Sequence, residues 1–192
     1  MEKIKKLKNI FKNEKIDGYI IPKNDEFFGE YIPSYNDRLN YISNFTGSYG
    51  FALILKNKNY LFVDGRYTLQ ANKQSGNFFQ IKTIPLESPN EVLKNKKLNI
   101  GFDPKLFTKK NLNIFFGKTN CKYTSMRENL VDKIWIRKKE KVRKKFYTLP
   151  QVSTSENYKS KIKKVIFNFN KYKADFQFIT ASENNAWLLN IR

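Results

Sequence analysis

Two apolar runs separated by four polar residues constrain the fold of this 192-residue chain more than any other feature. Residues 51–55 and 60–63 are apolar throughout, and the turn Lys56-Asn57-Lys58-Asn59 lies between them. Because Asn tolerates the positive φ angles of tight turns, the pattern predicts a β-hairpin. A sheet is therefore expected to form part of the fold.

Helices and further strands are expected on either side of this hairpin. Apolar residues at helical spacing predict an amphipathic helix from the amino terminus to about Asn13. Residues 16–21 form a short apolar strand that ends at Pro22. A helix is expected from Thr68, with further strands at 79–84 and 98–102. Short strands that alternate with helices predict an α/β layer domain up to about residue 130.

A similar pattern returns late in the chain. Ile162, Val165 and Phe169 repeat the first helix at a constant offset of 158 residues. The segment 174–179 then takes the place of the first strand. We therefore predict an incomplete second copy over residues 156–192, made of one helix and about two strand-like segments. Such a unit cannot cover its strands, so we expect these apolar side chains to stay partly exposed: Phe176, Phe178, Ile179, Trp187, Leu188, Leu189 and Ile191.

A strongly basic run separates the two copies. Residues 137–145 contain seven basic side chains in nine and little that could be buried. We interpret residues 136–155 as an exposed linker, since charged runs of this kind are usually solvated surface. A basic tail that binds nucleic acid is the alternative interpretation.

The net charge of the whole chain also has two interpretations, a bias of amino-acid composition or a preference for polyanions. Lys and Arg number 37 against 17 Asp and Glu, which gives a formal charge of +20. Only six of the basic residues are Arg, the side chain whose fork matches phosphate oxygens. A basic composition that is rich in Lys and poor in Arg favours a bias of amino-acid composition over a preference for phosphate groups, so nucleic acid is not the expected partner. A stand-alone basic module for RNA or other polyanions remains the alternative.

The absence of histidine excludes several classes of chemistry. A histidine triad, a histidine general base or a His-ligated zinc site cannot be built from this chain alone. The single cysteine, Cys121, cannot form an internal disulfide, which fits a reducing compartment. No segment reaches the roughly 18 apolar residues of a membrane span, and the charged amino terminus has no apolar stretch after it. We expect a cytoplasmic protein without a membrane anchor.

Six segments, in order along the chain, resemble the amino-terminal part of Xaa-Pro aminopeptidases. The stretches Asp64-Gly65-Arg66-Tyr67 and 129–135 are the most specific for this family. The six segments lie at residues 30–32 with Arg38 downstream, 45–52, 62–71, 101–104, 128–135 and 186–192.

The resemblance implies a creatinase/prolidase N-terminal-like mixed sheet flanked by helices over residues 1–135. The basic linker 136–155 would follow, and then the truncated second creatinase-type domain, 156–192. In this family a third, "pita-bread" domain carries out catalysis with two divalent metals, often manganese, held by two Asp, one His and two Glu. That domain is absent from this chain, so no catalytic or metal-binding residue can be assigned here.

The resemblance also carries expectations about function. The family removes the N-terminal residue that precedes a proline, so its substrates are peptides with proline at the second position. Its members form homodimers, and the amino-terminal domains would contribute to substrate access and dimerisation. An inactive homologue that acts as a regulatory subunit is a further alternative.

Arg66 is the candidate residue closest to substrate. Its guanidinium could orient a carboxylate or carbonyl in a pocket, or it could pair with Asp64 and fix the turn at Gly65. We favour the turn role, since Asp-Gly segments commonly form turns. We expect structural roles for the other residues of the family signature: Asp64, Gly65, Tyr67, Asp103, Trp135, Trp187, Asn190 and Arg192.

Overall fold

A computed structural model describes residues 2–29, 31–137 and 145–192. The described chain divides into two compact units. The first contains residues 2–26 and 31–137, and the second contains residues 27–29 and 145–192.

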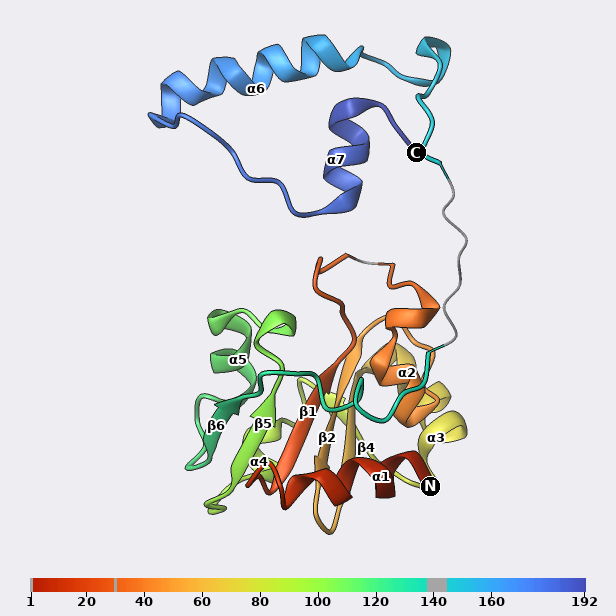
Figure 1. Cartoon of the computed structure of the whole chain (residues 1–192), viewed down its shortest axis with the longest axis vertical. Helices are drawn as coiled ribbons and strands as arrows, with labels where there is room; N and C mark the ends of the chain where they lie inside the picture. Colours follow the sequence, from red (N-terminus) through yellow and green to blue (C-terminus); the bar gives the residue numbers. More distant parts are fainter. Residues whose placement is uncertain (1, 30, 138–144) are drawn as a thin grey trace. The chain divides into compact units, whose positions relative to one another are not determined.

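The first unit is built on a six-stranded sheet of order β4-β3-β2-β1-β5-β6 (Figure 1). Its strands are β1 Gly18–Pro22, β2 Gly50–Leu55, β3 Asn59–Asp64, β4 Gln80–Ile84, β5 Asn99–Phe102 and β6 Lys122–Ser125. β2 pairs antiparallel with both β1 and β3, whereas β4, β5 and β6 pair parallel with their neighbours. The predicted hairpin and the predicted mixed sheet are therefore confirmed.

Five helices accompany the sheet in the described part of the first unit. They are α1 Glu2–Phe11, α2 Arg38–Ser43, α3 Thr68–Ser75, α4 Pro89–Val92 and α5 Lys109–Phe116. α1 runs across the strands in Figure 1 and buries Ile4, Leu7 and Phe11, as its apolar spacing predicts. Short 3₁₀ helices connect some of these elements: Ser34–Asn36, Gly65–Tyr67 and Pro104–Leu106.

The central strands β1, β2 and β3 are buried on both faces of the sheet. In β1, Tyr19 and Ile21 pack into one core cluster with α1, α2 and α3. Ile20 points into the other cluster, where Phe116 of α5 and Leu93 after α4 pack. Successive side chains of a strand point to opposite faces, so a strand covered on both sides must be apolar at every position. This is the physical reason for the uninterrupted apolar runs of the sequence.

The second unit is helical in its described residues. α6 Tyr158–Tyr172 and α7 Ser182–Leu189 follow a short 3₁₀ helix, Gln151–Ser153. The helix predicted around Ile162 is confirmed as α6. The prediction of a strand at 174–179 is wrong, because these residues form no β-strand in the structure. A strand needs a neighbour that accepts and donates its backbone hydrogen bonds, and this segment finds none.

The apolar side chains of the second unit stay partly exposed, as predicted. Phe176 is 82% exposed, Phe178 86% and Trp187 64%. The other four side chains of the predicted set are intermediate or exposed as well. The unit therefore presents a large apolar surface to solvent.

Part of the expected linker is paired with the end of the chain. Tyr147 and Arg192 exchange backbone hydrogen bonds of 2.7 and 2.9 Å, and Thr148 and Ile191 form an antiparallel bridge. The Leu149 N–H donates to the Asn190 carbonyl over 2.8 Å. Residues 147–149 thus form backbone hydrogen bonds within the second unit. Residues 138–144 of the basic run lie outside the described residues, and the domain boundaries stay a prediction.

Candidate functional site

Arg66 lies in a tight turn where β3 ends. The Asp64 carboxylate accepts the Arg66 backbone N–H at 2.8 Å and so caps the 3₁₀ helix that leads into α3. The same carboxylate accepts the guanidinium, at 2.7 Å from Nη2 and 3.1 Å from Nε. The Arg66 hydrogen bonds hold the pKa of Asp64 below its ordinary value. Arg66 Nη1 has no hydrogen-bond partner in the part of the chain that the structure describes.

A pocket of about 760 Å³ opens beside this turn. Asp64, Gly65 and Arg66 supply its polar edge. The remaining wall is mostly apolar and consists of Tyr49, Ile84, Pro85, Pro89, Ile114 and Phe115, with Ser88. The pocket has the size and apolar lining of a small-ligand site. It can hold an apolar group while Arg66 donates to a carboxylate or carbonyl.

Tyr67 connects the turn to a neighbouring loop. Its hydroxyl lies 2.7 Å from the Ser48 hydroxyl, and this hydrogen bond lowers the pKa of Tyr67. The Tyr67 ring packs edge-on against the buried ring of Phe45. The Arg66 guanidinium carbon lies 5.5 Å from the centre of the Tyr67 ring. Within the Asp64-Gly65-Arg66-Tyr67 signature, Asp64 and Arg66 are thus joined by hydrogen bonds at the rim of the pocket, and Tyr67 links the turn to Ser48.

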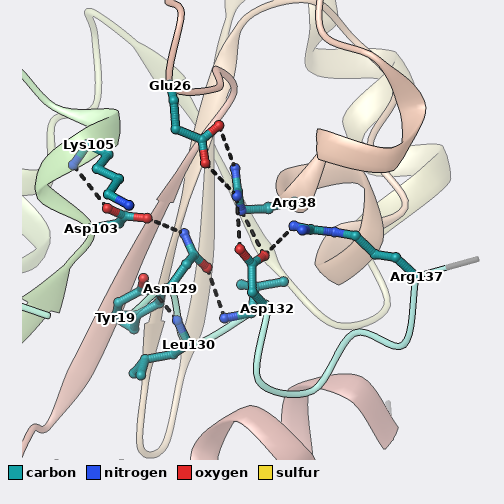
Figure 2. A network of polar contacts seen from close by, with 10 residues as sticks. Tyr19, Glu26, Arg38, Asp103, Lys105, Asn129, Leu130, Asp132 and Arg137 are labelled. Carbon is teal, nitrogen blue, oxygen red and sulfur yellow. Dashed lines mark hydrogen bonds and ion pairs between the residues drawn. The ribbon is translucent and has the colours of Figure 1, made fainter. Parts of the chain in front are cut away.

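Arg38 forms a second polar centre that sequence reasoning did not single out. It begins α2, its side chain is 3% exposed, and Figure 2 shows Glu26 and Asp132 on either side of its guanidinium. Nε and Nη2 donate to the two Asp132 oxygens at 2.8 and 2.9 Å, and Nη2 donates to Glu26 at 2.8 Å. Arg137 also donates to Asp132. We call these four residues the Arg38 cluster.

The charges in the Arg38 cluster support one another. Burial tends to raise the pKa of Glu26, but the hydrogen bonds it accepts and the charges of Arg38 and Arg137 together outweigh burial, and the pKa is lowered. Burial tends to lower the pKa of Arg38, but Asp132 and Glu26 outweigh it and the pKa is raised. Asp132 is 94 positions from Arg38. No local pattern could have paired them, and the cluster joins the first part of the unit to its last segment.

Asp103 belongs to a network next to this cluster. Its carboxylate accepts the Lys105 backbone N–H at 2.9 Å, which caps the 3₁₀ helix after β5, and the Asn129 amide at 2.8 Å. The Leu130 N–H donates to the buried Tyr19 hydroxyl (Figure 2). Asp103 therefore fixes a turn and anchors the segment after β6. The structure does not bring it to Asp64.

Trp135 packs at the end of the segment that follows β6. Its ring stacks on Tyr41 of α2 with centroids 4.5 Å apart, and the Tyr41 hydroxyl donates to the Ile134 carbonyl. The Arg137 guanidinium carbon lies 4.8 Å from the centre of the Trp135 ring. These contacts fix the end of the first unit.

Trp187 and Asn190 hold α7 against α6 in the second unit. The buried Lys161 donates from Nζ to the Trp187 carbonyl at 2.7 Å and to Asn190 Oδ1 at 2.6 Å. Its ammonium also lies 4.2 Å from the centre of the Trp187 ring. Asn190 Nδ2 donates to the Glu156 carbonyl. Lys161 was missed because a lysine in a basic helix carries no signal of burial, and its partners lie 26 and 29 positions away.

The residues present do not fit the two-metal site that the family resemblance implies. Among the described residues, no three side chains of His, Cys, Asp or Glu are grouped so that they could hold a metal ion. The chain contains no histidine.

Among the residues that the structure describes, no helix is long and apolar enough to cross a membrane.

Two curated relatives match nearly the whole chain. A protein of Penicillium rubens named "Probable Xaa-Pro aminopeptidase P" is 33% identical over 207 residues and is matched by the entire chain. A protein of the same name from Coprinopsis cinerea is 30% identical over 196 residues, which include 97% of this chain. The matched region is 33% and 32% of these proteins. The chain thus spans about a third of the length of its curated relatives.

Structural comparison gives the same result. The crystal structure of an X-prolyl aminopeptidase from Caenorhabditis elegans, described as a cytosolic enzyme with a di-nuclear active site, matches with a TM-score of 0.83. The match has 25% identity and covers all of this chain and 34% of the other. The family model for the Creatinase/Prolidase N-terminal domain matches residues 3–133, and the chain belongs to this family.

Proposed function

We propose that this chain is the amino-terminal, non-catalytic portion of a metal-dependent Xaa-Pro aminopeptidase of the cytoplasm. The observation that carries the proposal is the extent of the similarity. The chain is similar along its whole length to proteins with this name, yet it spans only a third of them. The chain has no histidine, and its described residues contain no group of side chains that could hold a metal ion, which supports a non-catalytic role.

The complete enzyme would remove the N-terminal residue of peptides with proline at the second position. Two divalent metals, often manganese in this family, would be held outside the present chain. The first unit would support a homodimer and shape substrate access through the pocket beside Arg66. A sheet covered on both faces is a rigid support for such a pocket.

A chimera tests the proposal directly. Residues 1–192 would replace the matching amino-terminal third of the C. elegans X-prolyl aminopeptidase. We expect a dimer that binds metal and hydrolyses an Xaa-Pro peptide, since the two folds agree along the whole chain. A chimera that keeps its metal content and melting temperature but fails to dimerise or to cleave the peptide would contradict the proposed role.

The isolated chain provides the second test. Purified residues 1–192 should not hydrolyse the same peptide with or without manganese, because the described residues cannot assemble a metal-bound hydroxide. The C. elegans enzyme is the positive control in the same assay. Manganese-dependent turnover by a homogeneous preparation would show that the chain is itself catalytic.

A further inference from the structure

A second hollow lies at the opposite end of β3 from Arg66. β3 runs from Asn59 to Asp64, so the hairpin turn and the Arg66 turn lie at its two ends. The hollow measures about 460 Å³ and opens between the hairpin turn and the segment that enters β5. We call it the lysine pocket, and its lining is Asp17, Leu55, Lys56, Asn57, Lys58, Tyr60, Lys96, Lys97 and Leu98.

The wall of the lysine pocket contains three apolar side chains. Leu55 and Tyr60 are buried members of the second core cluster, and Leu98 packs against that cluster. These residues are fixed by the sheet, since Leu55 ends β2 and Tyr60 lies in β3. The hydrocarbon stems of lysines extend such an apolar surface outward. The pocket therefore has a firm apolar base under a flexible charged rim.

The charges on the rim are mostly unbalanced. Four lysines line the pocket against a single acid, Asp17. The Asp17 carboxylate is already used, because it accepts Lys56 Nζ at 2.5 Å and the Asn99 backbone N–H at 2.9 Å. Lys96 Nζ donates to the Val92 carbonyl.

Two lysines are left to bind a ligand. Across residues 2–29, 31–137 and 145–192, neither Lys58 nor Lys97 has an ion pair or a side-chain hydrogen bond. Their ammonium groups belong to the two neighbouring segments that form the opening, the hairpin turn and the entry to β5. An anion between these segments would gain charge-assisted hydrogen bonds from both sides.

We propose that the lysine pocket binds a small organic polyanion with a flat apolar body, of the nucleoside polyphosphate class. The phosphates would bind Lys58 and Lys97, and the base would pack on the apolar wall at Leu55, Tyr60 and Leu98. The volume fits one small ligand. RNA would need a basic track with exposed aromatic side chains for several bases, and Tyr60 is the single aromatic side chain in the lining of this pocket. This site is independent of the proposed peptidase function.

The test compares two ligands and two charge-matched variants of the whole 192-residue chain by isothermal titration calorimetry. ATP should bind with a stoichiometry of one and about tenfold more tightly than inorganic tripolyphosphate, because only ATP uses the apolar wall. Lys58→Gln with Lys97→Gln should weaken ATP binding about fivefold or more. The control, Lys109→Gln with Lys110→Gln, removes two exposed lysines of α5, and it should change ATP affinity by less than about twofold.

Several outcomes would overturn the proposal. The first is that ATP shows no saturable binding, and the second is that tripolyphosphate binds with the same affinity as ATP. The third is that both variants lose the same amount of ATP affinity, which would indicate attraction by net charge alone. If a short single-stranded RNA binds with higher affinity than ATP, and if the pocket variant loses more RNA affinity than the control variant does, the ligand is RNA instead.

A second measurement avoids substitutions altogether. Photo-crosslinking with 8-azido-ATP should label peptides that contain residues 55–60 or 96–98, and labelling confined to other peptides would contradict the assignment.

Discussion

Individual residues of this chain show how partners far apart in sequence make a buried charge tolerable. Arg38 is almost completely buried, and two carboxylates accept its hydrogen bonds. A buried pair contributes modestly to net stability, but removal of one member leaves the others without compensation. The Arg38 cluster therefore fixes the last segment of the first unit mainly because the cluster is costly to break.

Arg38→Ala should destabilise the first unit by about 3 kcal/mol, because Glu26 would lose its guanidinium partner and Asp132 would keep only Arg137. The measurement is urea unfolding of the 192-residue chain, followed by circular dichroism. Arg127→Ala is the matched control. Arg127 is exposed, and its loss should change the free energy of unfolding by no more than about 0.5 kcal/mol. Similar effects of the two substitutions would show that the cluster has no special role.

The pKa of Glu26 predicts a dependence of stability on pH. This pKa is lowered in the folded chain from an ordinary value of 4.5. A carboxylate of this kind stabilises the fold above its unfolded pKa, and the stabilisation is lost as pH falls through the folded pKa. Glu26→Gln should therefore lower the urea midpoint at pH 6 and have a smaller effect at pH 3. Glu183→Gln, at an exposed position, should show no such change. The same loss at both pH values would contradict the prediction.

For Arg66 we predict a larger effect on stability than on activity. In the chimeric enzyme, Arg66→Ala should lower the melting temperature while kcat/KM stays within about threefold, because Arg66 is held by Asp64 in a turn. Thermal unfolding and peptide hydrolysis of the same preparation separate the two effects. A large fall in kcat/KM at an unchanged melting temperature would instead assign Arg66 to substrate orientation.

At the scale of elements, helices of this chain follow local pattern, whereas strands depend on neighbours. α1 and α6 both form where apolar residues recur at helical spacing. The strand at 16–21 forms as β1 because β2 and β5 pair with it. The equivalent segment 174–179 has no such neighbour within residues 145–192 and forms no strand. Two similar local patterns therefore led to a strand at 16–21 and to no strand at 174–179.

Lys161→Met should weaken the packing of α7 on α6. The substitution keeps the length of the apolar stem but removes two hydrogen bonds and leaves the Trp187 carbonyl and Asn190 Oδ1 without their donor. The expected cost is about 1–3 kcal/mol in local stability, measured by amide exchange of α7. Lys163→Met, at an exposed position of the same helix, should leave that exchange unchanged. Equal exchange in all three proteins would exclude a role for the contact.

At the scale of the whole molecule, the two units differ in what they can bury. The first unit closes two core clusters around its sheet. The described part of the second unit is two helices, a short 3₁₀ helix and connecting segments with exposed aromatic side chains. Because burial of apolar surface is the main favourable term in folding, the two units should differ in stability.

Hydrogen exchange should reveal this difference directly. Amides of β1, β2 and β3 should exchange slowly, through global unfolding of the first unit, because their hydrogen bonds are buried on both faces. Amides of residues 156–192 should exchange much faster than the amides of these strands. Mass spectrometry of the intact 192-residue chain after timed labelling provides the measurement. Strong and equal protection in both units would show that the second unit is stabilised beyond its own contacts.

The elements that have local signals could be predicted from the amino-acid sequence. The hairpin follows from two apolar runs and an Asn-containing turn, and α1 and α6 follow from their apolar spacing. The family also follows from short segments that are contiguous in the chain, such as Asp64-Gly65-Arg66-Tyr67. Each of these features depends on residues within one turn, one element or one segment.

The roles of residues that are far apart in the chain became clear from the three-dimensional fold. It paired Arg38 with Asp132, gave Lys161 a buried place, and brought Lys58 and Lys97 to one hollow. It also left 174–179 without the neighbour that a strand requires. The physical reason is that burial, charge pairing and sheet hydrogen bonding depend on which segments meet in space. A local pattern cannot encode that information.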